Sequence, residues 1–244
     1  MKIRFDSIRR ALRGAAVLLA VTSAACGDLP TGPAPEDDRV RGIDVSRWQG
    51  TIDWNAVAGD DVEVVFIKAT EGGDFTDPRF AANWAAARQA GVLRGAYHFY
   101  RPQTSATKQA EHFLRTVPLA PGDLPPVLDV EVTDGASPDS IARGVRTWLE
   151  AVERATGRRP IIYTRASFWT PSVGAASSEY PLWVAHYGVA EPNLPAGWPD
   201  WTFWQHTDEG RVTGIAGNVD QNWFNGTRDQ LRTFAATGAI PVDR

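Results

Sequence analysis

Short apolar segments of strand length recur eight times along this chain after residue 40. They cover residues 41–46, 62–70, 92–100, 126–132, 160–164, 182–187, 201–206 and 218–224. Helical patterns separate several of them, at residues 80–90, 105–117 and 137–156. Strands that alternate with helices indicate an α/β fold, and eight of them predict a barrel of the TIM type. The connections after residue 165 are too short to contain the helices of a regular ring, so we expect an irregular β/α barrel with fewer helices than strands.

The composition suits one globular domain of this kind. The chain has 244 residues, of which 43% are hydrophobic and 22% charged, which is enough to bury one large core. We therefore predict a single catalytic domain over residues 41–236, followed by a short tail at 237–244. The formal net charge is −4, and no basic patch is visible, which argues against nucleic-acid binding. The expected state is a monomer.

Two carboxylates stand two residues apart at the end of the fourth apolar segment, Asp129 and Glu131. Side chains alternate along a strand, so both carboxylates should point to the same side. Like charges held this close raise one pKa, which leaves a neutral acid beside an anion. We expect the raised pKa on Glu131, with Asp129 remaining ionised. A pair of this kind can cleave a glycosidic bond, although acidic pairs at strand ends are also common as solvated edges.

Other strand ends carry acids as well. Asp44 lies near the end of the first apolar segment and Asp220 lies in the last, and each has an aromatic residue a few positions away. The segment that ends Lys-Ala-Thr-Glu-Gly places Glu71 at a further strand end. Acids at several strand ends are expected if those ends converge on one pocket, which in β/α barrels lies at the carboxyl ends of the strands.

Five motifs together give the chain a resemblance to a known family. They read D-V-S-R-W-Q-G from Asp44, K-A-T-E-G from Lys68, A-Y-H-F from Ala96, D-V-E from Asp129 and V-D-Q-N from Val219. In this order the chain resembles glycoside hydrolase family 25, the lysozymes that act as N-acetylmuramidases. The resemblance covers about residues 41–234 and implies a flattened β/α barrel that cleaves the β-1,4 bond between N-acetylmuramic acid and N-acetylglucosamine in peptidoglycan glycan strands.

The resemblance also implies residue roles. Glu131 would be the general acid, and Asp129 would orient the substrate or stabilise an intermediate, with Asp44 and Asp220 lining the same cleft. The family's expected nucleophile is the substrate's own acetamido group, with water activation and inversion as the alternative. A further set would contact the sugars, with core packing about equally expected for its aromatic members: Tyr97, Phe99, Tyr163, Trp183, Tyr187, Trp204 and Gln205.

The first residues read as an export signal. Five basic residues and one acidic residue precede a short apolar run, so removal of residues 1–25 would lower the formal net charge from −4 to −8. Cys26, the only cysteine, directly follows Ser23-Ala24-Ala25. We therefore expect residues 1–26 to be a lipoprotein signal with Cys26 lipidated, and residues 27–40, rich in Pro and acids, to be a linker. The protein would then be exported and membrane-anchored, facing the periplasm or the cell exterior. The alternative is ordinary signal cleavage and secretion.

Other functions have less support. The histidines lack the spacing of a metal site, so we expect no metal and no cofactor, and we interpret His98 as a hydrogen-bonded core residue. Lys68 should share a strand face with Thr70 and serve as a paired barrel lysine. Two alternatives remain open: a wall-binding lipoprotein that holds glycan without cutting it, and a glycosidase acting on a related amino-sugar polymer.

Overall fold

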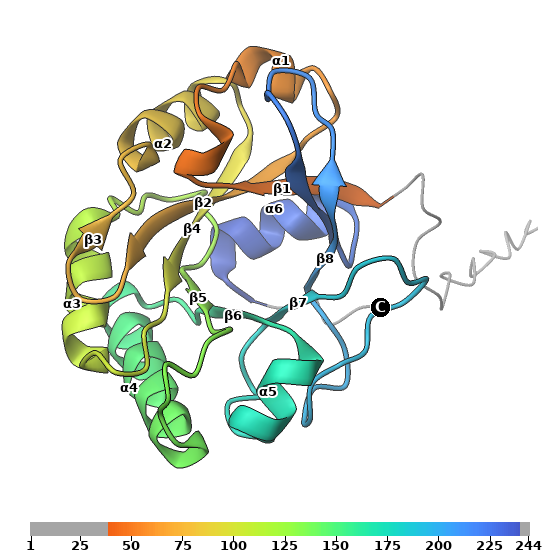
Figure 1. Cartoon of the computed structure of the whole chain (residues 1–244). Coiled ribbons are helices and arrows are strands. Elements are labelled where there is room, and N and C mark those ends of the chain that lie inside the picture. The colour runs from red at the N-terminus through yellow and green to blue at the C-terminus, as the bar shows by residue number, and fades with distance from the viewer. Residues whose placement is uncertain (1–38, 240–244) are drawn as a thin grey trace, which may run out of the picture.

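The computed structural model describes residues 39–239, in which eight strands form a closed barrel (Figure 1). The barrel strands are β1 (Val40–Val45), β2 (Val64–Glu71), β4 (Leu93–Phe99), β5 (Val127–Asp129), β6 (Ile161–Thr164), β7 (Leu182–Ala185), β8 (Phe203–Gly210) and β9 (Val219–Phe224). Strand β1 pairs with both β2 and β9, which closes the ring. The two-residue β3 (Phe75–Thr76) is added outside the ring, antiparallel to β2. The predicted β/α barrel of eight strands is confirmed.

The irregularity lies at the closing strand. Among the barrel strands, neighbours from β1 through β8 run parallel, whereas β9 is antiparallel to both β8 and β1. A parallel crossover needs a dozen or more residues, and only residues 211–218 separate β8 from β9, so the chain turns back as a hairpin. The short connections after residue 165 thus indicated the departure from a regular ring.

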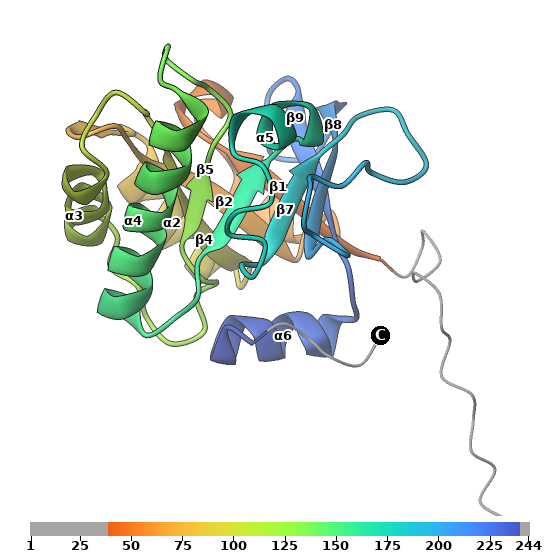
Figure 2. The ribbon, with the colours of Figure 1, turned by 90° about the horizontal axis from the view of Figure 1, so that it is seen from below.

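Six α-helices accompany the barrel within residues 39–239, fewer than its strands, as expected. They are α1 (Trp54–Ala58), α2 (Phe80–Gln89), α3 (Ala106–Thr116), α4 (Pro138–Thr156), α5 (Ala166–Ser172) and α6 (Arg228–Thr237). The helices predicted at 80–90, 105–117 and 137–156 are α2, α3 and α4. Helices α2 to α5 lie around the outside of the barrel, and α6 lies across one end (Figure 2).

Local sequence explains the longest helix, α4. Ser137 caps its start by accepting from the backbone N–H of Ser140, and Pro138 occupies the first turn, where no N–H is needed. Gly157 ends it in the left-handed conformation, with φ at 68°. Its buried side chains recur at helical spacing and face the barrel: Ile141, Val145, Trp148, Leu149 and Val152.

Two apolar cores follow from the alternation of the strands. One lies between the strands and the outer helices and includes Ile67 and Trp148. The other fills the barrel interior with Phe66, Phe203 and Phe224. Helix α6 covers one end of the barrel with Phe234. Side chains and α6 close this end, and in the described part of the chain the cleft opens at the other end, where the parallel strands finish.

Some sequence predictions concern residues that the structure does not describe. The signal segment 1–26 with Cys26 lies outside the described residues, as do residues 27–38 of the linker and 240–244 of the tail. Between residues 39 and 239, no helix has the length and apolar character required to cross a bilayer.

Candidate active site

A cleft of about 300 Å³ opens at the carboxyl ends of the parallel strands. Four carboxylates line it: Asp44, Asp129, Glu131 and Asp220. Six aromatic side chains line it as well: Trp48, Tyr97, Phe99, Tyr163, Trp183 and Tyr187. Ser46, Gln49, Lys68 and Gln205 add polar groups. The structure therefore brings together all four acids predicted from the sequence.

Asp129 and Glu131 enter the cleft from the end of β5. Asp129 is the last residue of the strand and is 6% exposed, whereas Glu131 follows it in the loop and is half-buried. The Oδ1 atom of Asp129 is buried and has no hydrogen-bond partner among the described residues. A carboxylate oxygen that is dehydrated in this way is strongly disfavoured as an anion unless a ligand donates to it.

The charge states of this pair differ from the sequence expectation. Burial raises the pKa of Glu131, as expected, but the nearby cations of Arg165, Lys68 and Arg101 oppose that rise. Burial raises the pKa of Asp129 well above its ordinary value, and the charge of Glu131 raises it further. Asp129 is therefore the better proton holder of the two, because it is the more deeply buried.

Asp44 and Asp220 face each other across the closure of the barrel. They are direct partners in the antiparallel pairing of β1 with β9. Burial raises the pKa of Asp44 well above its ordinary value, with the charge of Asp220 as the second cause. Burial also raises the pKa of Asp220 to about 6. Of these two carboxyl groups Asp44 is the more deeply buried, and it therefore holds a proton more strongly than Asp220.

An amide network fixes Asp44. Its Oδ2 accepts from Gln205 Nε2 at 2.8 Å and from Asn222 Nδ2 at 2.9 Å. The Oε1 atom of Gln205 accepts from the hydroxyls of Tyr163 at 2.7 Å and Tyr187 at 2.6 Å. Two tyrosines predicted as sugar contacts thus also hold the amide that orients Asp44. Each of these two amides is itself held by further hydrogen bonds, so the network leaves Asp44 little rotational freedom.

Asn222 was missed by the sequence reasoning, although it stands in the V-D-Q-N motif. It is completely buried, and its Oδ1 accepts from Trp183 Nε1 at 2.7 Å. The signal was available, because Asp220 and Asn222 are two residues apart on one strand and must face the same side. Trp183, predicted as a sugar contact, is almost fully buried and contributes to the cleft mainly as its wall.

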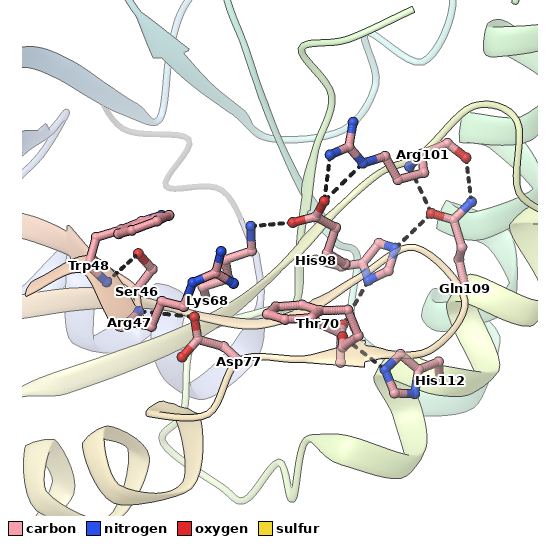
Figure 3. A network of polar contacts seen from close by, with 12 residues as sticks. Ser46, Arg47, Trp48, Lys68, Thr70, Asp77, His98, Arg101, Gln109 and His112 are labelled. Atoms are coloured by element: carbon pink, nitrogen blue, oxygen red, sulfur yellow. Dashed lines mark hydrogen bonds and ion pairs between the residues drawn. The ribbon is translucent and has the colours of Figure 1, made fainter. Parts of the chain in front are cut away.

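A charged network borders the cleft on the side of β2 and β4 (Figure 3). Lys68 Nζ donates to Glu71 Oε2 at 2.7 Å, and Arg101 binds Glu71 Oε1 at 2.6 Å. Both cations also lie over the ring of Phe99, at 4.7 and 4.8 Å from its centroid. Lys68 is therefore a paired barrel lysine, as expected, and it also lines the cleft. Each carboxylate oxygen of Glu71 is bound by one of these two cations at the border of the cleft.

The expectation that Lys68 and Thr70 share a strand face is wrong. A β-bulge shifts the pairing of β2 with β4 between these residues, so the simple alternation fails there. Lys68 reaches the cleft, while Thr70 Oγ1 bonds to His98 Nδ1 at 2.7 Å on the outer side. His98 is buried, bonds to Gln109 through Nε2 at 3.0 Å and stacks on Trp148. It is the hydrogen-bonded core residue that the sequence predicted, and burial lowers its pKa to about 4.

Trp204 is the predicted sugar contact that the structure does not bring to the cleft. It belongs to the core outside the barrel, and its Nε1 donates to the carbonyl of His186 at 2.8 Å. Its neighbour Gln205 points inward, as the alternation of β8 requires. Among residues 39–239, no three His, Cys, Asp or Glu side chains are grouped so as to hold a metal ion.

A second hollow of about 290 Å³ continues the cleft past Glu131. It shares Glu131, Tyr163 and Tyr187 with the first, so the two form one groove. Arg165 and Asn193 line this extension, and sequence reasoning identified neither, because both lie in connections without a strand pattern. A long groove with acids at its centre and aromatic walls suits a polymer of sugars, whose rings present flat C–H faces and many hydroxyls.

A closed β/α barrel with paired carboxylates of raised pKa in such a groove defines a class of enzyme, the carboxylate-dependent glycoside hydrolases. Comparison with known proteins gives the particular family. Residues 43–215 match the family described as Glycosyl hydrolases family 25, and the chain belongs to it.

Individual relatives agree. The chain is 46% identical over 205 residues to the uncharacterized protein YegX of Escherichia coli, covering 82% of this chain and 75% of YegX. It is 42% identical over 217 residues to Lysozyme M1 of Streptomyces globisporus, covering 84% of this chain and 74% of that protein. The crystal structure of the bacterial lysozyme from Streptomyces coelicolor superposes with a TM-score of 0.79 at 41% identity, covering 82% of this chain and 98% of that one.

Proposed function

We propose that this protein is an N-acetylmuramidase that cleaves the β-1,4 bond between N-acetylmuramic acid and N-acetylglucosamine in peptidoglycan. The observation that carries the proposal is the group of four buried or half-buried carboxylates around one groove, with pKa values raised by burial. Membership of family 25 and the similarity to Lysozyme M1 support the choice of peptidoglycan as substrate.

Glu131 is the proposed general acid. It is half-buried, so its proton is retained to a higher pH than in water, yet it lies where the groove continues and a glycosidic oxygen can reach it. Its protonated carboxyl group donates to the leaving oxygen as the bond to the sugar carbon breaks. Removing such a group typically costs ~10²–10⁴ in rate.

Asp129 is the proposed partner of the substrate's acetamido group. Its buried Oδ1 has no donor in the described structure, and an acetamido N–H supplies one. A hydrogen bond to the anion lowers the pKa of Asp129, so substrate binding shifts the shared proton toward Glu131, where the reaction needs it. The oriented acetamido oxygen then attacks the sugar carbon as the bond to the leaving oxygen breaks, and Asp129 stabilises the resulting oxazolinium charge. Water, giving a proton to Glu131, then attacks the same carbon and regenerates the acetamido group. This route gives retention; activation of water by one of the acids, giving inversion, is the alternative.

Product analysis tests the proposal. Purified peptidoglycan is digested with the protein, the new reducing ends are reduced with borohydride, and the sugar alcohols are identified. A muramidase yields muramicitol, and Glu131→Gln should yield almost none. Glucosaminitol as the main product would contradict the assignment. NMR of the first-formed anomer separates retention from inversion.

The two alternative functions give different results in the same assay. A wall-binding lipoprotein would sediment with peptidoglycan but release no reducing ends. A glycosidase for a related polymer would cut chitin-like chains of N-acetylglucosamine faster than peptidoglycan. The four retained carboxylates favour a catalyst over a binding protein, because loss of one acid would suffice to abolish cleavage.

We further propose that the protein is exported and anchored through lipidated Cys26, supported by the position of this lone cysteine after an apolar run ending in small residues. Produced in a bacterial host, the protein should partition with membranes into detergent, and Cys26→Ser should release it. A soluble protein with a free Cys26 thiol would contradict the anchor and leave ordinary secretion.

A further inference from the structure

Trp48 is the most exposed large hydrophobic side chain among the described residues, at 78%. It nevertheless lines the cleft together with the four carboxylates. The other exposed large hydrophobic side chains are Tyr187, which also lines the cleft, and Val189. Leaving an indole in water forgoes the free energy of burying it. Single exposed apolar side chains are common on protein surfaces, so the informative feature of Trp48 is its place in the lining of the cleft.

The backbone under Trp48 is firmly held. Residues Arg47–Gln49 form one turn of 3-10 helix directly after β1. Ser46 caps this turn: its Oγ accepts from Trp48 N at 3.3 Å, and its own N–H donates to Gln49 Oε1 at 2.9 Å. Arg47 N donates to buried Asp77 Oδ2 at 3.0 Å (Figure 3). The indole is therefore presented by a capped turn with a fixed direction.

One face of the indole is supported by a cation. The Arg47 guanidinium lies 4.6 Å from the Trp48 ring centroid and 5.0 Å from that of Phe75, so it bridges the two rings. This contact fixes the orientation of the ring. The exposed fraction of 78% leaves the remaining surface of the indole open to solvent beside the cleft.

We propose that Trp48 is a platform on which an amino-sugar ring of the glycan stacks, forming a binding subsite that extends the cleft away from the reacting bond. This inference deepens the proposed function and rests on it. A pyranose ring presents a flat C–H face that packs on an indole, and a rigid indole loses little conformational entropy on binding. A protein partner fits less well, because Trp48 is an isolated side chain at a polar cleft, and not part of a broad apolar surface.

A series of glycan oligomers tests the platform. Amidase-treated glycan strands, freed of peptides, are fractionated by length from the disaccharide upward, and KM and kcat are measured for each. For the wild type, KM should fall at the length that first reaches Trp48. Trp48→Ala should lose this fall, with KM about tenfold higher on long oligomers and kcat unchanged, because only uniform binding is removed. Trp48→Phe, which keeps an aromatic face, should recover part of the affinity.

The matched control is Val189→Ala, which trims an exposed apolar side chain that does not line the cleft. Its KM should match the wild type at every length. An equal KM for Trp48→Ala and the wild type on long oligomers, or an equal loss on the disaccharide, would overturn the platform. Thermal melts of each variant establish that the fold is kept.

Failure of the proposed function gives a different result. If the wild type cuts no oligomer, the muramidase assignment fails. The platform is then tested by measuring the binding of each oligomer by calorimetry. Affinity that steps up with length in the wild type but not in Trp48→Ala supports it without any cleavage. Affinity independent of length, or unchanged in Trp48→Ala, refutes it.

Discussion

Replacing Asp220 with Asn should stabilise the protein at neutral pH while impairing its activity. Burial raises the pKa of Asp220 from 3.8 to about 6, so in this interval the folded state binds more protons than the unfolded state. The free energy of unfolding therefore falls as pH rises through this window. Asp220→Asn removes the ionising group, and its amide can donate to Asp44, its neighbour across β1 and β9.

The magnitude follows from the pKa. A rise of about two pH units corresponds to about 3 kcal/mol at 1.36 kcal/mol per unit. Asp220 is partly exposed, so solvent screening reduces this to about 1–2 kcal/mol. For a domain of this size such a gain raises Tm by about 2–8 °C. The gain should be complete above pH 7 and absent below pH ~3.8, where both states hold the proton.

Urea unfolding of the wild type and Asp220→Asn at several pH values measures the effect, together with turnover of peptidoglycan. Asp74→Asn is the matched control, because it makes the same chemical change at an exposed position away from the cleft, and it should alter stability by less than about 0.5 kcal/mol. A destabilised Asp220→Asn at neutral pH, or a gain equal at acidic and neutral pH, would refute the reasoning.

Three further predictions concern the protonation of Glu131 and His98. Glu131→Gln should lower kcat by ~10²–10⁴ and abolish the alkaline limb of a bell-shaped pH–rate profile; near-normal activity would remove Glu131 from its role. Arg165→Gln should move the alkaline limb to higher pH, because Arg165 is the leading positive charge that lowers the pKa of Glu131, and an unmoved limb would contradict this. Burial lowers the pKa of His98 from 6.5 to about 4, so its contribution to stability is complete above pH 6.5 and is lost as pH falls toward 4, by about 3 kcal/mol in all. Urea unfolding of His98→Gln should show a weaker fall in this range; an identical fall would assign the acid sensitivity to other groups.

The sequence predicted the elements whose side chains follow a simple period. The barrel strands alternate between core and cleft, and α4 repeats its apolar positions at helical spacing, so both were visible without a structure. The acids of the cleft were visible for the same reason, because Asp129 and Asp220 stand at strand positions whose facing is set by alternation. The same rule, applied to Phe203 and Gln205, would have placed Trp204 outside the barrel.

Features that depend on tertiary context were not predictable. The bulge between Lys68 and Thr70 has no local mark in the sequence, and it turns Thr70 away from the cleft that Lys68 reaches. Arg165 and Asn193 come from connections whose paths are set by the packing of the barrel. The proton preference of Asp129 over Glu131 required the relative burial of two side chains that the sequence treats alike.

The barrel closes by pairing its first strand, β1, with its last strand, β9, so the site can form only after β9 has been synthesised. Asn222 bonds to Asp44 across a sequence separation of 178 residues, and Asp220 arrives on the same final strand. A polypeptide that is still being synthesised, or one truncated before β9, lacks half of the carboxylates that face each other at the closure. Contacts this distant in sequence are also among the slowest to form. Recovery of activity during refolding should therefore time the closing of the ring itself, later than signals from helices α3 and α4.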